Sequence, residues 1–145
     1  MNLSYDPGPD MELETRDAVL EYLGVRDKEN LLRPFLKQPD QPKRMLDIGC
    51  GVGGYLVAGQ NLGLEVEGVE PSGSHSTIAR SLGFNVNQGY FVADEYPAET
   101  YDLVVLSHVI EHRYEPFEFL RGIMKVLKPD GLLVVSTPNA GSTIA

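Results

Sequence analysis

The spacing of apolar residues changes near residue 44 of the chain. Upstream, apolar positions recur at helical spacing, which predicts two helices, at about residues 11–23 and 28–37, the second bent near Pro34. Downstream, short apolar runs alternate with helical patterns. We therefore expect an N-terminal arm with cap helices over residues 1–43 and an α/β domain over residues 44–145.

Five short apolar segments of the second region predict strands, at residues 45–48, 64–70, 84–88, 101–107 and 132–136. Helical patterns lie at residues 52–62, 71–83 and 116–128, and a turn is expected at 129–131. Strands that alternate with helices predict a doubly wound, mainly parallel sheet with helices on both faces. Ligands of such sheets lie beyond the carboxyl ends of the strands, so the residues that follow each strand are the candidates for function.

A glycine-rich loop, GCGVGG at residues 49–54, follows the first predicted strand. Glycine permits positive φ and a close approach of a ligand to the main chain, and the next helix offers unpaired N–H groups. The loop fits G-x-G-x-G through Gly53 and the dinucleotide pattern G-x-G-x-x-G through Gly54. Two cofactor classes therefore remain open at this point, and a plain glycine-rich turn is the structural alternative.

Glu70 ends the second predicted strand, twenty-one residues after Gly49. An acidic residue at this place accepts hydrogen bonds from both hydroxyls of an adenosine ribose, one with each carboxylate oxygen. The alternative is an ordinary solvated glutamate, since Glu65 and Glu67 lie nearby. The position at the strand end, before Pro71 and a turn, favours a ribose site.

Several segments, in the family's order, resemble the class I S-adenosylmethionine-dependent methyltransferases. They are LDIGCGVG at 46–53, GVEPS at 68–72, YDLVVLSHVIEH at 101–112, LKPDG at 127–131 and STPN at 136–139. The similarity is strongest to the small-molecule branch with a Glu-His pair after strand four. It covers about residues 44–139 and implies a Rossmann-like sheet of about five strands in the order 3-2-1-4-5.

The resemblance also assigns roles along the cofactor. Asp47 and the glycine loop match residues that hold the methionine part, Glu70 matches the ribose-binding acid, and the segment after strand three frames the adenine. Many relatives have an aspartate in that segment, whereas the first aspartate here is Asp94. The implied cofactor-binding residues are Asp47, Gly49, Cys50, Gly51, Gly53, Glu70, Pro71, Ser72, Gly89, Tyr90, Ser107 and His108.

His112 is the candidate catalytic residue, because it lies four residues after His108 at the expected reacting centre and histidine exchanges protons near neutral pH. A structural hydrogen bond or a capping role is the alternative. Cys50 is expected to be a small buried residue beside the cofactor rather than a nucleophile. Three scattered histidines and one cysteine predict no metal site.

Composition narrows the partners. Twelve basic and twenty-one acidic residues give a net charge of −9, which disfavours a nucleic-acid backbone as ligand. No apolar run approaches the ~20 residues of a membrane span, the first residues are polar and acidic rather than a secretory leader, and a single cysteine forms no intrachain disulfide. We therefore expect a cytoplasmic protein with a small-molecule methyl acceptor.

Members of the resembled family usually have two further strands, one antiparallel, after the fifth. The resemblance therefore implies a domain that is short at its C-terminus, with an open edge beside strand five that predicts a homodimer or low activity. The leading hypothesis is a methyltransferase that converts S-adenosylmethionine to S-adenosylhomocysteine. The alternatives are a nicotinamide-dependent oxidoreductase fragment, favoured by the glycine ambiguity, and a non-catalytic cofactor-binding module.

Overall fold

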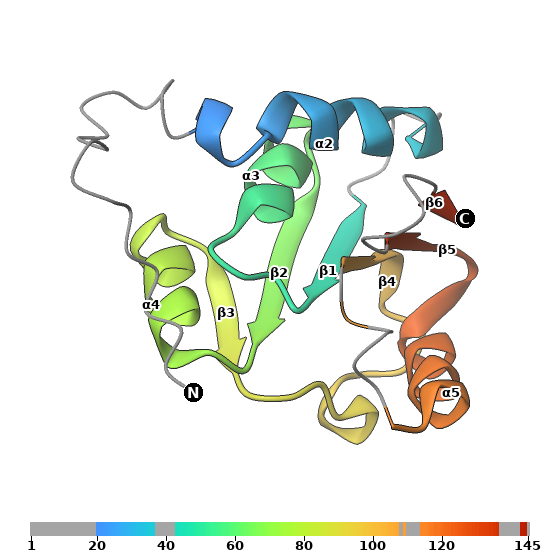
Figure 1. Ribbon diagram of the computed structural model, residues 1–145. Helices are drawn as coiled ribbons and strands as arrows, with labels where there is room; N and C mark the ends of the chain where they lie inside the picture. Colours follow the sequence, from blue (N-terminus) through green and yellow to red (C-terminus); the bar gives the residue numbers. More distant parts are fainter. Residues whose placement is uncertain (1–19, 37–42, 108, 110–113, 137–142, 145) are drawn as a thin grey trace.

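The computed structural model describes residues 20–36, 43–107, 109, 114–136 and 143–144 (Figure 1). Strands β1 to β6 span Arg44–Ile48, Glu65–Glu70, Asn85–Gln88, Tyr101–Ser107, Leu127–Ser136 and Thr143–Ile144. Helices α2 to α5 span Val25–Leu32, Gly54–Asn61, Gly73–Ser81 and Pro116–Val126, and the 3-10 turns η1 and η2 span Arg33–Phe35 and Ala93–Glu95. The sheet order is β3-β2-β1-β4-β5-β6, which confirms the predicted order of the first five strands.

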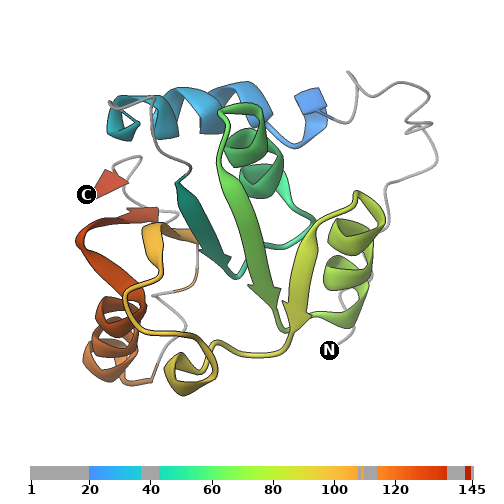
Figure 2. The same cartoon turned by 180° about the vertical axis from the view of Figure 1, so that it is seen from behind.

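The two faces of the sheet carry separate hydrophobic clusters, because side chains alternate across each strand. Met45 of β1 and Val105 of β4 pack with α2, α3 and α4 on one face. Leu46 and Val104, which adjoin Met45 and Val105 in the same strands, pack with α5 on the opposite face. Helices therefore cover both faces, as predicted (Figures 1 and 2).

Glycines set two helix starts that differ from the predicted ones. Gly24 has a φ of 62°, so α2 begins at Val25 rather than near residue 28. Gly53 has a φ of 106°, which no helical residue adopts, so α3 begins at Gly54 and not at Val52. Pro34 lies in η1 directly after α2, where the predicted bend falls. Residues 11–19 of the first predicted helix lie outside the described residues.

The predicted end of α5 was wrong. The helix ends at Val126, and β5 already begins at Leu127. Tyr101 pairs with Leu127 and Leu103 pairs with Leu132, so the expected turn at residues 129–131 is an irregular bulge within a strand. Gly131 permits this path, because a Cβ there would lie 2.9 Å from the Lys128 carbonyl oxygen.

The expectation that the β5 edge is wholly uncovered was also wrong. β6 runs antiparallel to β5 and pairs with it at Val135 and Ser136, so the sheet has a short sixth strand. Among the described residues, β6 pairs with β5 nowhere else, and the earlier part of β5 has β4 as its one neighbour.

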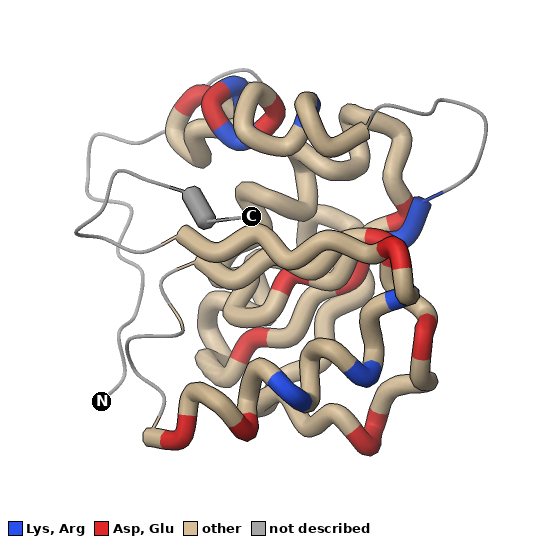
Figure 3. The backbone as a smooth tube through the Cα atoms, turned by 90° about the vertical axis from the view of Figure 1, so that its right-hand side faces the viewer, with Lys and Arg blue, Asp and Glu red and all other residues tan. Residues whose placement is uncertain are grey.

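Charges of both signs are dispersed along the tube, with blue segments separated by tan and red ones (Figure 3). No helix within the described ranges combines the length and the apolar character needed to cross a bilayer.

Candidate functional site

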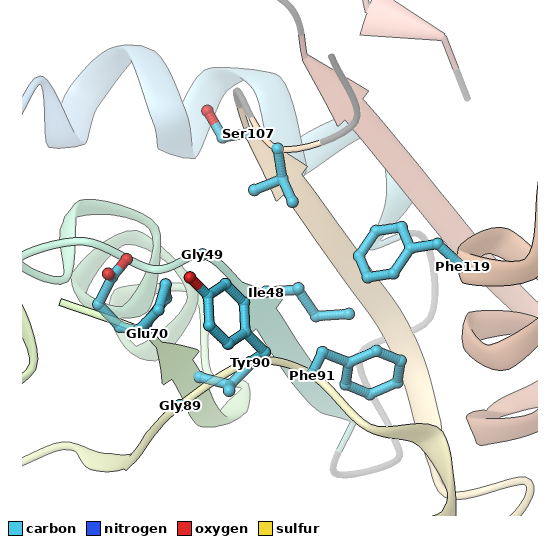
Figure 4. A pocket seen from close by; sticks show the side chains of 11 residues that line it. Ile48, Gly49, Glu70, Gly89, Tyr90, Phe91, Ser107 and Phe119 are labelled. Atoms are coloured by element: carbon cyan, nitrogen blue, oxygen red, sulfur yellow. The ribbon is translucent and has the colours of Figure 1, made fainter. Parts of the chain in front are cut away.

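Two cavities open at the carboxyl ends of the strands. They lie at the switch point between β1 and β4, where the order of the strands reverses. The first, about 360 Å³, is the Glu70 cavity (Figure 4), lined by Ile48, Gly49, Val69, Glu70, Pro71, Gly89, Tyr90, Phe91, Ser107, Val109 and Phe119. The second, about 410 Å³, is the Asp47 cavity, lined by Tyr22, Leu23, Lys28, Asp47, Gly49, Cys50, Val52, Gly54, Tyr55 and Ser107. Gly49 and Ser107 line both, so the two cavities adjoin at these residues.

Strand alternation explains why the cavities lie on different faces of the sheet. Asp47 lies two positions after Met45 and shares its face, which α2 and α3 cover. Ile48 and its register partner Val69 lie on the opposite face, with α5. A ligand that occupies both cavities must therefore pass around the end of β1, at Gly49.

The glycine loop turns sharply at this place. Gly49, Gly51 and Gly53 have φ of 76°, 55° and 106°, all in the left-handed region that favours glycine. A Cβ on Gly49 would overlap the Val109 side chain. The backbone N–H groups of Gly49 and Cys50 both donate to the Val69 carbonyl, at 2.8 and 3.1 Å, which fixes the loop to β2. The loop therefore forms part of the walls of both cavities and is more than a glycine-rich turn.

Glu70 is held in place by backbone donors. It is 7% exposed, Oε1 accepts from the Gly51 N–H at 3.0 Å, and Oε2 accepts from the Ser72 N–H at 2.7 Å. Ser72 caps α4 by accepting from the His75 N–H, so the second donor comes from a fixed helix start. Each carboxylate oxygen retains a lone pair for another donor. Glu70 is thus not an ordinary solvated glutamate, whereas Glu65 in the same strand is exposed.

Asp47 has the opposite status. It is 1% exposed, and its Oδ1 accepts no hydrogen bond from any described residue. Burial, helped by the nearby Glu70 carboxylate, raises the pKa of Asp47 to about 7, while Lys28 acts in the other direction. A buried oxygen without a donor is unfavourable, so the geometry fits a ligand that brings N–H groups into the Asp47 cavity.

Lys28 is a site residue that the sequence analysis missed. Its ammonium donates to the Leu23 carbonyl at 2.7 Å and lies 5.3 Å from the centre of the Tyr55 ring. A Cβ on Gly54 would lie 3.0 Å from Lys28 Cε, so the glycine leaves room for the lysine stem. The only sequence signal was a lysine in a predicted helix, because its place in the cavity depends on how α2 packs on α3.

Cys50 packs under the loop as expected. It is buried, and a Cβ on the facing Gly68 would lie 2.7 Å from its sulfur. Burial, together with the charges of Asp47 and Glu70, raises the pKa of the Cys50 thiol. The residue therefore remains a neutral thiol and not a reactive thiolate.

The far wall of the Glu70 cavity is aromatic (Figure 4). Tyr90, next to Gly89, is 71% exposed. Phe91 is buried and meets Phe119 of α5 edge to face, with ring centres 6.0 Å apart. Asp94 is exposed in η2 and does not line the cavity. The described segment after β3 therefore contributes glycine and aromatic residues to the cavity lining, and no aspartate.

The remaining predicted site residues have different outcomes. Pro71 and Ser107 line the Glu70 cavity. His108 and the candidate base His112 lie outside the described residues. Among the residues that are described, no three His, Cys, Asp or Glu side chains gather in a way that could hold a metal ion.

Comparison with known proteins gives consistent matches. A family model described as a methyltransferase domain matches residues 19–144. A relative from Rhizobium etli, named ubiquinone biosynthesis O-methyltransferase, is 36% identical over 124 residues, which cover 79% of this chain and 50% of the relative. The crystal structure of a SAM-dependent methyltransferase from Archaeoglobus fulgidus has a TM-score of 0.65 and 28% identity, covering 81% of this chain and 55% of that one.

A second similar structure is not named as a methyltransferase. The [4+2]-cyclase SpnF has a TM-score of 0.60 and 27% identity, with 78% of this chain and 47% of that chain covered. This chain thus spans about half the length of the curated relatives and solved structures that it matches.

Proposed function

This chain belongs to the methyltransferase-domain family, and from that premise we propose that it is an S-adenosylmethionine-dependent methyltransferase with a small-molecule acceptor. The observation that carries the proposal is the pair of buried carboxylates at the ends of neighbouring strands. Glu70 is already fixed by two backbone donors, and Asp47 has an oxygen without a donor.

The residues fit the parts of this cofactor. Asp47 suits the amino group of the methionine part, because a buried carboxylate oxygen there needs a donor. The two Glu70 oxygens suit the two ribose hydroxyls, and the aromatic wall with Tyr90 suits the adenine. Gly49, which lines both cavities, suits the place where the ligand passes from one to the other.

When bound, S-adenosylmethionine supplies an activated methyl group on a positively charged sulfur. The protein's contribution is to align the acceptor with that group and to exclude water, which is worth on the order of 7–11 kcal/mol for well-oriented reactants. Asp47 and Glu70 also attract a ligand of net positive charge. His112 is proposed as a base or as a residue that positions the acceptor, and its substitution by alanine should then lower turnover without changing cofactor affinity.

The acceptor is proposed to be a small molecule. Relatives named for ubiquinone biosynthesis support this class, and the dispersed charges of the described chain offer no basic stripe for a nucleic acid (Figure 3). Tyr22 and Leu23 line the Asp47 cavity, which supports the division into a cap over residues 1–43 and a cofactor domain after it. A cytoplasmic location is proposed with this function.

A homodimer through the β5 edge is part of the same proposal, now confined to the stretch before Val135 that β6 leaves without a partner in the described chain. Sedimentation velocity over a range of concentrations tests it. A compact monomer at the highest concentration would argue against the dimer and leave the cofactor site unaffected.

A non-catalytic cofactor-binding module is the second candidate. The similarity to SpnF, which is named a cyclase, supports only that a chain with this similarity need not transfer a methyl group. Transfer of a labelled methyl group to a pool of metabolites separates the two, because only the enzyme gives a labelled product. The nicotinamide alternative is not proposed again, since the family model and the similar structure from Archaeoglobus fulgidus are those of methyltransferases.

Calorimetric titration with S-adenosylhomocysteine and with NADH tests the cofactor assignment. We expect saturable binding of the first ligand and none of the second. Glu70→Ala should weaken the binding strongly, and Glu65→Ala, which alters an exposed glutamate of the same strand, is the matched control that should retain it. Unchanged affinity in Glu70→Ala would overturn the ribose assignment.

A further inference from the structure

α2 brings one ammonium group into a cavity that already holds a buried carboxylate. Lys28 is fixed from two sides, by the Leu23 carbonyl at 2.7 Å and by the Tyr55 ring at 5.3 Å. Its stem lies along Gly54, where a Cβ would make a tight contact of 3.0 Å with Lys28 Cε. These contacts hold the ammonium beside the cavity in the free protein, so it does not depend on a ligand for its position.

Several ionisable groups face Asp47 from the elements packed around it. Glu70 comes from β2, Cys50 from the glycine loop, Tyr55 from α3 and Lys28 from α2. On β4, the register partner of Asp47 is the apolar Val105, and Ser107, which lines the same cavity, carries no charge. Among the described residues around Asp47, Lys28 is thus the one cation, against the carboxylates of Asp47 and Glu70.

The ligand that suits this cavity needs Asp47 in its charged form. A carboxylate accepts hydrogen bonds from an ammonium group and attracts its charge, whereas a protonated carboxyl does neither as well. Burial and Glu70 both disfavour the carboxylate, and Lys28 is the group that favours it. The ammonium can therefore affect ligand binding without touching the ligand.

We propose that Lys28 is a positioning residue for cofactor binding: held by Leu23 and Tyr55, its ammonium favours the carboxylate form of Asp47, which receives the cofactor's amino group. This inference rests on the proposed function and adds to it a source of pH dependence. The free protein must lose the Asp47 proton before the cofactor binds tightly, so affinity falls as the pH drops through the pKa of Asp47.

The test is calorimetric titration with S-adenosylhomocysteine from pH 6 to pH 9, on wild type, Lys28→Met, Lys28→Arg and Lys125→Met. Affinity should fall below the pH at which Asp47 is half ionised. We expect this pH, called the midpoint, near 7 in wild type and roughly one pH unit higher in Lys28→Met. The variant should then bind about tenfold more weakly at pH 6.5 and nearly as well as wild type at pH 9. Lys28→Arg should restore the wild-type midpoint, and Lys125→Met, an exposed lysine of α5, should leave it unchanged.

Two results would overturn the inference while the proposed function stands. One is an equal loss of affinity at every pH in Lys28→Met, which indicates direct contact with the ligand. The other is an unchanged midpoint. If wild type binds S-adenosylhomocysteine at no pH, the proposed function itself is wrong. Titration of the ligand's own groups is common to all the proteins, so it cancels in the comparison. Lys28→Gln serves for the same comparison if Lys28→Met does not fold.

Discussion

The Glu70 cavity and the Asp47 cavity meet at Gly49, yet their carboxylates are prepared in different ways. Glu70 is satisfied before any ligand arrives, because Gly51 and Ser72 donate to its two oxygens. Asp47 is more deeply buried and has an oxygen with no donor in the described chain. One half of the site is thus complete in the free protein, and the other half is completed by what binds.

Glu70→Ala should give the largest effect on binding. The substitution removes the acceptor proposed for both ribose hydroxyls and leaves two backbone N–H groups without their partner. Hydrogen bonds to charged groups contribute about 1.5–3 kcal/mol each, so affinity for S-adenosylhomocysteine should fall on the order of 100-fold or more. Calorimetry measures it, with Glu65→Ala as control. A loss below tenfold would contradict the assignment.

Asp47→Asn should weaken binding and stabilise the free protein. The raised pKa of Asp47, about 7 in the fold against 3.8 as reference, means that its contribution to stability is complete below pH ~4 and is lost as the pH rises through 7. Asparagine has no such loss. The free energy of unfolding of the variant should therefore rise relative to that of wild type between pH 5 and pH 8, by on the order of 1–4 kcal/mol. Its affinity for S-adenosylhomocysteine should fall about tenfold or more.

Urea unfolding of the free proteins at pH 5 and pH 8 measures this gain. Both pH values are needed. A difference in free energy of unfolding that is the same at both would reflect only how the amide packs. A stability gap that does not grow with pH would contradict the account of Asp47.

Gly49→Ala should damage the junction of the two cavities. Its φ of 76° is strained for alanine, and the new methyl group would overlap Val109. Gly63→Ala is the matched control, since Gly63 has a φ of 88° with open space around it. Strain alone costs about 1–2 kcal/mol, and the overlap should add about 1–3 kcal/mol in Gly49→Ala only. Equal unfolding midpoints in urea would show that the close approach to Val109 has no effect.

Tyr90→Ala should have the smallest effect and sharpen the account of the aromatic wall. Because Tyr90 is largely exposed, its loss should change stability by less than about 0.5 kcal/mol. An aromatic contact is worth roughly 0.5–1.5 kcal/mol, so S-adenosylhomocysteine affinity should fall about two- to twelvefold. Phe91→Ala should instead destabilise the fold by about 3–5 kcal/mol, since Phe91 is buried. Thermal unfolding with calorimetry distinguishes the two residues, and unchanged affinity in Tyr90→Ala would remove it from the site.

The strand order that the family resemblance implied was confirmed. Asp47 and Glu70 end up where parallel strands bring their ends together, which follows from the alternation of strands and helices. The start of β5 at Leu127 was not predictable, because the helical spacing of α5 continues through Lys128 and only pairing with Tyr101 ends it. The start of α3 was likewise predicted too early, at Val52, because the positive φ of Gly53 is not visible in the hydrophobic pattern.

The charge balance of the Asp47 cavity was also beyond the sequence. Lys28 lies nineteen positions before Asp47, and the packing of α2 on α3 decides that the two share a cavity. Nor does spacing indicate that Glu70 has backbone donors while Asp47 Oδ1 has none. The sequence thus indicated the two carboxylates of the candidate site, whereas three-dimensional packing brings Lys28 to the same cavity and sets the environment in which Asp47 ionises.

The most direct test of the central claim is a crystal structure of the protein with S-adenosylhomocysteine. The account predicts one ligand that spans both cavities past Gly49, with its amino group on Asp47 Oδ1 and its ribose hydroxyls on Glu70. A ligand bound elsewhere, or one that leaves Asp47 Oδ1 without a donor, would contradict it.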